Sequence, residues 1–103
     1  MSKSKGQEID FSHRVTVPTT VLIRELDGEA VILNLDTGIY FGLDDTGTRM
    51  WGVLSSSESI QEAFDQLLEE YEVEPEILTS ELNRFLKELL DNQLTEIGPR
   101  VLA

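Results

Sequence analysis

The sequence has no cysteine and only one histidine, His13, among its 103 residues. A chain without cysteine forms no disulfide, no thiolate nucleophile, and no zinc or iron–sulfur site built on sulfur ligands. His13 lies near a polar N-terminal segment with no second ligand type beside it. We therefore expect a surface histidine, and no catalytic residue, metal site or cofactor is predicted.

Long apolar segments are also missing. No run approaches the roughly 18 residues that a membrane-spanning helix needs, and residues 1–10 lack the hydrophobic stretch of a signal peptide. We expect a cytoplasmic protein without a membrane partner. The length is that of one domain, and 40% hydrophobic residues are sufficient for a small packed core.

Basic residues are few, with 8 Lys and Arg against 20 Asp and Glu and a net charge of -12. Residues 55–103 carry three cations and twelve acids, or -9. Because non-specific nucleic-acid affinity comes from Lys and Arg displacing counterions, this balance disfavours nucleic acid as a partner. It would steer a cationic peptide or protein toward the surface, although exposed glutamates also simply keep small proteins soluble.

Two turn signals divide residues 21–43 into three strands. Residues 21–26 and 29–35 are rich in β-branched and aliphatic side chains and are joined by Asp27-Gly28, a strong hairpin signal. The segment 36–38 then leads into residues 39–43. This pattern predicts a three-stranded antiparallel meander.

Helical periodicity follows the strands. Asp44 can cap a helix that runs to about Leu54, and residues 59–62 have the capping-box form before a second amphipathic helix that reaches Tyr71. Pro75 suits the first position of a third helix, which Asn92 can end in a left-handed cap. Three strands followed by three helices predict an α+β, winged-helix-like fold.

The tripeptide Asp-Thr-Gly occurs at 36–38 and again at 45–47. It is the signature of aspartic proteases, in which two carboxylates share a proton. Two copies nine residues apart cannot take equivalent places in two symmetric lobes, and the second half of the chain is helical. A tight turn at the first copy and a first helical turn at the second account for both. The acidic run at 69–76 does not have the spacing of an EF-hand loop, and it is interpreted as a solvated edge.

Residues from Leu22 to about Leu94 resemble the PqqD-like family, small domains that bind the leader segment of ribosomally made precursor peptides. The resemblance covers roughly seven-tenths of the chain and is carried by RELDGEA at 24–30, LNLDTGIYFGL at 33–43, GTRMW at 47–51 and LLEEYEV at 67–73. It implies that the third strand and third helix line a cleft to which the leader adds as an antiparallel strand. The implied peptide-binding residues are Ile39, Tyr40, Phe41, Gly42 and Leu43 on the strand, and Leu78, Leu82, Phe85, Leu86 and Leu89 on the helix.

Our main hypothesis is therefore a non-catalytic adaptor that binds a precursor's leader and presents it to a separate modifying enzyme, either a radical maturase or a leader protease. We expect a monomer or weak homodimer, with a recognition domain at residues 13–97 between tails at 1–12 and 98–103. The topology alone leaves a winged-helix DNA-binding regulator open, which the acidic helical half disfavours. An acidic structural subunit of a larger complex is the third alternative.

Overall fold

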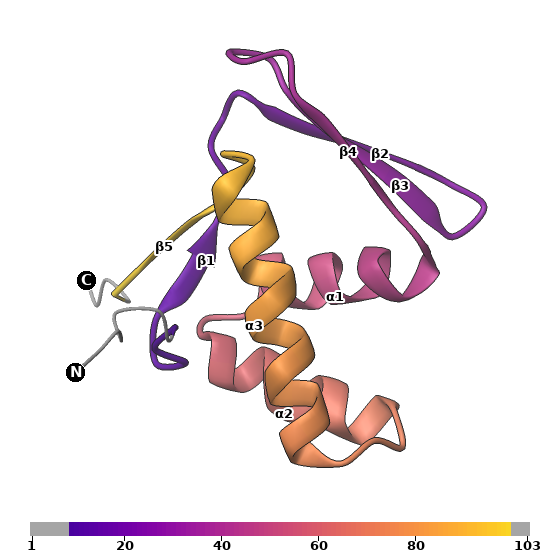
Figure 1. Cartoon of the computed structure of the whole chain (residues 1–103), viewed down its shortest axis with the longest axis vertical. Helices are drawn as coiled ribbons and strands as arrows, with labels where there is room; N and C mark the ends of the chain where they lie inside the picture. Colours follow the sequence, from indigo (N-terminus) through magenta and orange to yellow (C-terminus); the bar gives the residue numbers. More distant parts are fainter. Residues whose placement is uncertain (1–8, 100–103) are drawn as a thin grey trace.

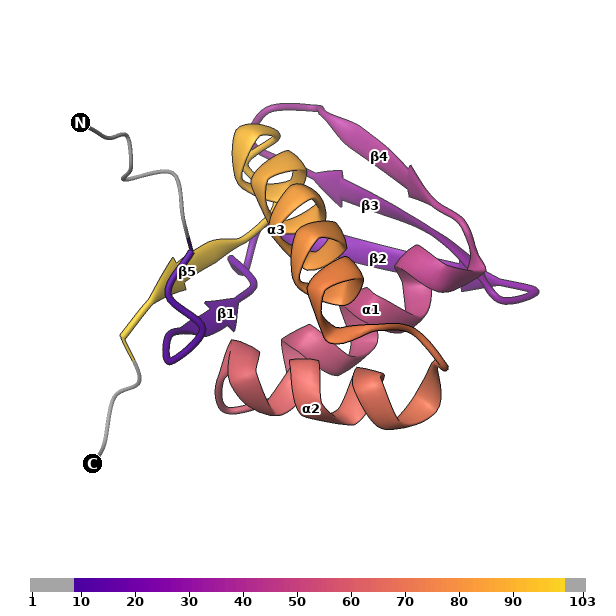
Figure 2. The same ribbon diagram turned by 60° about the horizontal axis from the view of Figure 1, so that its bottom comes forward.

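The computed structural model describes residues 9–99. The elements in chain order are β1 (Arg14–Thr16), β2 (Val21–Leu26), β3 (Glu29–Asn34), β4 (Tyr40–Leu43), α1 (Asp45–Ser56), α2 (Ile60–Glu70), α3 (Pro75–Asp91) and β5 (Glu96–Gly98). The helices lie on one side of the β2–β3–β4 sheet (Figures 1 and 2). The predicted α+β order of a three-stranded meander and three helices is confirmed.

The sheet has the expected antiparallel order β2-β3-β4. Asp27 and Gly28 both have positive φ, 56° and 83°, and Leu26 pairs with Glu29 on either side of them. Two left-handed residues in a two-residue loop are typical of a type I′ turn, whose twist matches that of the flanking strands. This turn fixes the register, so that Ala30, Ile32 and Asn34 face the helices and are buried.

Side-chain caps begin the first two helices. The Asp44 carboxylate accepts a hydrogen bond from the Gly47 N–H at 2.8 Å, and the Ser59 hydroxyl accepts one from the Glu62 N–H at 3.1 Å. Each cap satisfies a donor that the first helical turn leaves free. Glu74, before Pro75, makes no such bond, so α3 begins on the fixed φ of its proline.

The C-terminus of α3 corrects one sequence prediction. Asn92 has φ -95°, and the left-handed residue is Gln93, at φ 59°. The Gln93 N–H donates to the Leu90 carbonyl and the Leu94 N–H to the Leu89 carbonyl, the two bonds of a Schellman motif. Asn92 remains in the last turn because its side-chain amide donates to the Glu88 carbonyl at 2.8 Å.

A second sheet, of two strands, was not predicted. β1 and β5 pair antiparallel, with Val15 opposite Ile97, and bring the two ends of the described chain together. Both strands have only three residues, too few for alternation to be recognised in the sequence. Of the expected tails, residues 1–8 and 100–103 lie outside the described part of the chain, whereas Ile9 and Phe11 pack on the core and Gly98 ends β5.

The core lies between the inner face of the sheet and the three helices. Its fully buried members come from every helix, from β3 and from the segment after α3, and include Ile32, Val53, Ile60, Leu67, Leu82, Leu86, Leu89 and Leu94. α3 contributes three of them, more than any other element, so this helix is fixed against the core along one stripe. A different stripe of α3 is left to face β4.

Candidate functional site

Strand β4 is an edge of the sheet. It pairs with β3 on one side, and no strand within residues 9–99 pairs with its other side. An edge strand presents unpaired N–H and C=O groups to any extended segment that approaches it. The residues that face this opening therefore decide what the edge can bind.

The ladder shows which main-chain groups are free. Tyr40 lies opposite Leu33, which places Ile39 opposite Asn34, and the Asn34 N–H donates to the Ile39 carbonyl at 2.9 Å. Hydrogen-bonded and non-hydrogen-bonded pairs alternate in an antiparallel ladder. Phe41 and Leu43 therefore bond to β3, and the N–H and C=O groups of Tyr40 and Gly42 point away from the sheet.

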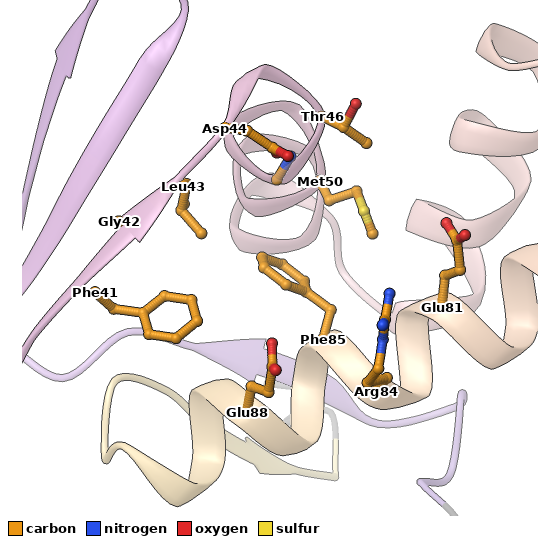
Figure 3. A pocket seen from close by; sticks show the side chains of 11 residues that line it. Phe41, Gly42, Leu43, Asp44, Thr46, Met50, Glu81, Arg84, Phe85 and Glu88 are labelled. Atoms are coloured by element: carbon orange, nitrogen blue, oxygen red, sulfur yellow. The ribbon is translucent and has the colours of Figure 1, made fainter.

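A cavity of about 470 Å³ opens beside this edge, between β4, the start of α1 and one face of α3 (Figure 3). Its lining residues are Phe41, Gly42, Leu43, Asp44, Thr46, Gly47, Met50, Glu81, Arg84, Phe85 and Glu88. Phe41 from β4 and Phe85 from α3 point into the space between the two elements, and Met50 points into it from α1. The cavity thus has an apolar floor next to an open row of main-chain groups.

Charged side chains line the α3 side of the cavity. Glu81, Arg84 and Glu88 are exposed and stand around Phe85 on the same helix. Arg84 makes no ion pair with another residue of the described chain. A polar, charged rim beside an apolar floor is the usual composition of a site that binds a peptide or small ligand.

Gly42 sits at the centre of the open edge. It pairs with Val31 in the regular ladder, so it forms no bulge. A side chain built on it would meet no atom within 4 Å. Both the outward main chain and the space around it are therefore accessible to a second backbone.

Comparison with known proteins identifies the family. The family model for coenzyme PQQ synthesis protein D (PqqD) matches residues 29–94. The chain belongs to the PqqD family. A search of curated protein sequences found no match to it.

Two solved structures resemble this PqqD-family chain. One, described as TbiB1 in complex with the TbiA(beta) leader peptide, is 34% identical, covers 79% of this chain and 94% of its own, and superposes with a TM-score of 0.74. The other, described as lasso peptide synthetase B1 complexed with the leader peptide, is 22% identical, covers 82% and 98%, and has a TM-score of 0.69. The second likeness bears on the fold alone.

The sequence-predicted site residues fall into three groups. Phe41, Gly42, Leu43 and Phe85 line the cavity. Ile39 and Tyr40 lie on the same strand segment but outside the cavity lining, and both are exposed. Leu78, Leu82, Leu86 and Leu89 are buried in the core, where they fix α3 in place from behind the cavity.

Seven lining residues were not among the predicted site residues: Asp44, Thr46, Gly47, Met50, Glu81, Arg84 and Glu88. Glu81, Arg84 and Glu88 are three, four and seven residues apart from one another, and Glu81 and Glu88 lie four residues before and three residues after Phe85. That periodicity was available in the sequence, but the apolar stripe beside it is longer and drew the prediction toward the core. Met50 is buried as well as lining the cavity.

The other sequence motifs take structural roles in this PqqD-family chain. The first Asp-Thr-Gly lies in the turn between β3 and β4, with Gly38 at φ 75°, and the second opens α1. His13 lies 3.6 Å from the Asp10 carboxylate at the surface. Within residues 9–99 no group of three or more potential ligands could hold a metal ion, and no helix there is long and apolar enough to cross a membrane.

Proposed function

We propose that this chain is a non-catalytic adaptor of the PqqD family that binds the leader segment of a ribosomally made precursor peptide. The leader adds as a fourth strand at the free edge of β4, and the adaptor presents the attached core peptide to a separate modifying enzyme. The adaptor binds the leader in the cytoplasm, where ribosomal peptides are made. A radical maturase and a leader protease are the two classes of enzyme that the adaptor would serve.

One observation carries the proposal: the unpaired edge of β4 lies directly beside the cavity in front of Phe85. Strand addition supplies main-chain hydrogen bonds, and alternate side chains of the added strand enter pockets that set specificity. In this chain the free main-chain groups of β4 and a cavity for side chains lie next to each other. The structure of a 34% identical relative, described as a complex with a leader peptide, supports the same kind of ligand.

The ladder gives the proposed contacts. The leader main chain bonds to the N–H and C=O groups of Tyr40 and Gly42, because these point away from β3. Every second leader side chain then faces the helices, where an apolar one packs among Phe41, Met50 and Phe85. Other helix-facing positions of the leader meet Glu81, Arg84 and Glu88 on α3.

The expected affinity is moderate. Each fully buried apolar anchor contributes about 1.5–3 kcal/mol, and association costs at least about 4 kcal/mol. Two or three anchors with a few main-chain bonds therefore give a dissociation constant of about micromolar. Such a complex forms readily and still releases the leader after modification.

Isotope-labelled protein and a synthetic leader test the proposal. The probe is the leader of the precursor peptide encoded beside the gene for this chain, with a scrambled peptide of equal charge as control. We expect amide shifts at residues 40–44 and 81–88 with the leader and not with the scrambled peptide. Shifts confined to β1, β5 or α2 would contradict strand addition at β4.

A further inference from the structure

The face of the sheet that points away from the helices is largely apolar, and its charged members are Arg24, opposite Val31, and Glu29, opposite Leu26. Along the strands, Leu22, Leu26, Val31, Leu33 and Tyr40 alternate with the residues that face the core, and we call these five side chains the outer face. Leu26 is 78% exposed and Tyr40 73% exposed. The solvent side of an antiparallel sheet is ordinarily polar, so this face differs from that pattern.

The register makes the outer face continuous. Leu22, Leu33 and Tyr40 lie opposite one another across the three strands, and Val31 stands in the next row outward on β3. Cross-strand neighbours on one face lie within contact distance. A contiguous apolar patch of this kind marks an interaction surface more often than scattered exposed residues do.

The outer face reaches the leader site. A hollow of about 540 Å³ at its end is lined by Arg24, Leu26, Glu29, Ala30, Val31, Gly42, Leu43 and Asp44. Gly42, Leu43 and Asp44 also line the cavity beside α3, so the two hollows meet at the end of β4. A leader strand paired with Tyr40 and Gly42 would widen the outer face by one strand, and half of its side chains would lie beside Tyr40.

We propose that the outer face is the docking surface for the modifying enzyme, which meets it with an apolar patch rimmed by Lys and Arg. This inference rests on the proposed function, because an adaptor that presents a leader must hold the enzyme within reach of it. An enzyme docked here contacts the adaptor and the outward side chains of the leader together. Leader binding and enzyme binding therefore strengthen each other.

Charge favours an enzyme with a basic rim over a second copy of the chain. Within residues 9–99, the exposed charged groups on and beside this face are the acids Asp27, Glu29, Asp36 and Asp44 and the single cation Arg24. Two copies meeting face to face would bring these acids together, in a chain whose net charge is -12. Like charges across an interface suppress association, whereas a basic partner is attracted.

A matched pair of substitutions tests the inference. Leu22 and Ile77 are both 48% exposed, the first on the outer face and the second at the start of α3, so Leu22→Glu and Ile77→Glu are the same change at two places. We expect Leu22→Glu to weaken binding of the enzyme encoded beside this gene about tenfold or more. Ile77→Glu should leave it unchanged, and both variants should bind the leader peptide normally.

Leu26→Glu serves as a second variant, because Leu26 is the most exposed residue of the outer face and its change leaves the core intact. Saturating leader should tighten enzyme binding to the unchanged chain several-fold, and less to either outer-face variant. Equal enzyme binding by all variants would overturn the docking surface while leaving leader recognition standing. So would a dimer of the unchanged chain that Leu22→Glu converts to monomers, since a second copy would then cover this face.

Discussion

The two edge strands of the sheet, β2 and β4, differ in how readily a further strand can pair with them. β2 carries Arg24 and Glu25 in its middle, and the Glu25 side chain lies on the face that the helices cover elsewhere. β4 has no charged residue from Tyr40 to Leu43, and it has Gly42 where its backbone is most open. Charges on an edge, particularly inward-pointing ones, are a common protection against unwanted strand pairing.

This difference shows that an unpaired edge strand becomes a specific binding site only where side chains of a neighbouring element lie beside it. At β4 the wall is the stripe of α3 that contains Phe85, together with the start of α1. An edge without a wall would pair with any extended chain. The leader site thus depends on both main-chain groups that are free and side chains that select.

Gly42→Pro should have the largest effect on leader binding at the β4 edge. Proline removes the outward N–H and places its ring at the open edge, while the ladder to β3, which uses Phe41 and Leu43, keeps its bonds. A leader carbonyl left without its donor costs about 1–3 kcal/mol. We expect leader affinity to fall about 30-fold, the middle of that range, measured by calorimetry.

Gly42→Ala is the control for this change. It retains the N–H, and its methyl group meets no atom within 4 Å. Binding should remain within about twofold of the unchanged chain, which is under about 0.5 kcal/mol. If the proline variant bound as well as the alanine variant, the leader would not pair with β4 through Gly42.

Phe41→Ala and Ile23→Ala compare the two edges directly. Both residues pack on the core as partly buried side chains, and both stand in the row that passes through Ile32, one on β4 and the other on β2. Each truncation should lower the free energy of unfolding by about 1–3 kcal/mol. Only Phe41→Ala should weaken leader binding, by about tenfold, since Phe41 alone lines the cavity. A similar loss of leader affinity in both variants would mean that the stability of the whole sheet controls affinity, and not contact with the cavity.

Asn34→Ala should have a smaller effect on binding. Asn34 is buried, and its side-chain amide donates to the Gln93 carbonyl at 2.6 Å, which ties the end of α3 to the end of β3. Losing that partly buried bond should destabilise the fold by about 0.5–1.5 kcal/mol. Because α3 forms one wall of the cavity, we expect leader affinity to fall about threefold.

Asn83→Ala is the matched control on the same helix, since the Asn83 amide donates only to the Thr79 carbonyl one turn away. Its effect on leader affinity should be negligible. If Asn83→Ala lowered leader affinity as much as Asn34→Ala, the loss of any side-chain amide bond along α3 would be enough to weaken binding. The position of its C-terminus would then not be the controlling feature.

Local signals accounted for most of the fold. The Asp27-Gly28 turn, the Ser59 cap and Pro75 each act within a few residues, so the sequence placed β2, β3, α2 and α3 within one residue of their observed bounds. The β1–β5 sheet joins residues about eighty positions apart, and no local pattern encodes that pairing. The site lies between these cases. The resemblance to the PqqD-like family implied the strand side of the site. The rotation of α3 about its axis is set by packing, so the charged residues beside Phe85 were not predicted.

The smallest expected effect lies away from both edges. The Arg49 guanidinium holds Glu70 through two hydrogen bonds, which link α1 to α2 at the surface. These bonds from Arg49 lower the pKa of Glu70 below its ordinary value of 4.5. A carboxylate with a lowered pKa in the folded state stabilises the protein above its unfolded pKa, and the contribution is lost as the pH falls through the folded pKa.

Arg49→Gln should therefore return the pKa of Glu70 toward 4.5 in a side-chain carboxyl titration by NMR. The variant should be slightly less stable at pH 7, equally stable in strong acid, and unchanged in leader binding, because neither residue lines the cavity. A loss of leader affinity in this variant would place the determinants of binding in the helical layer as a whole and not at the β4 edge.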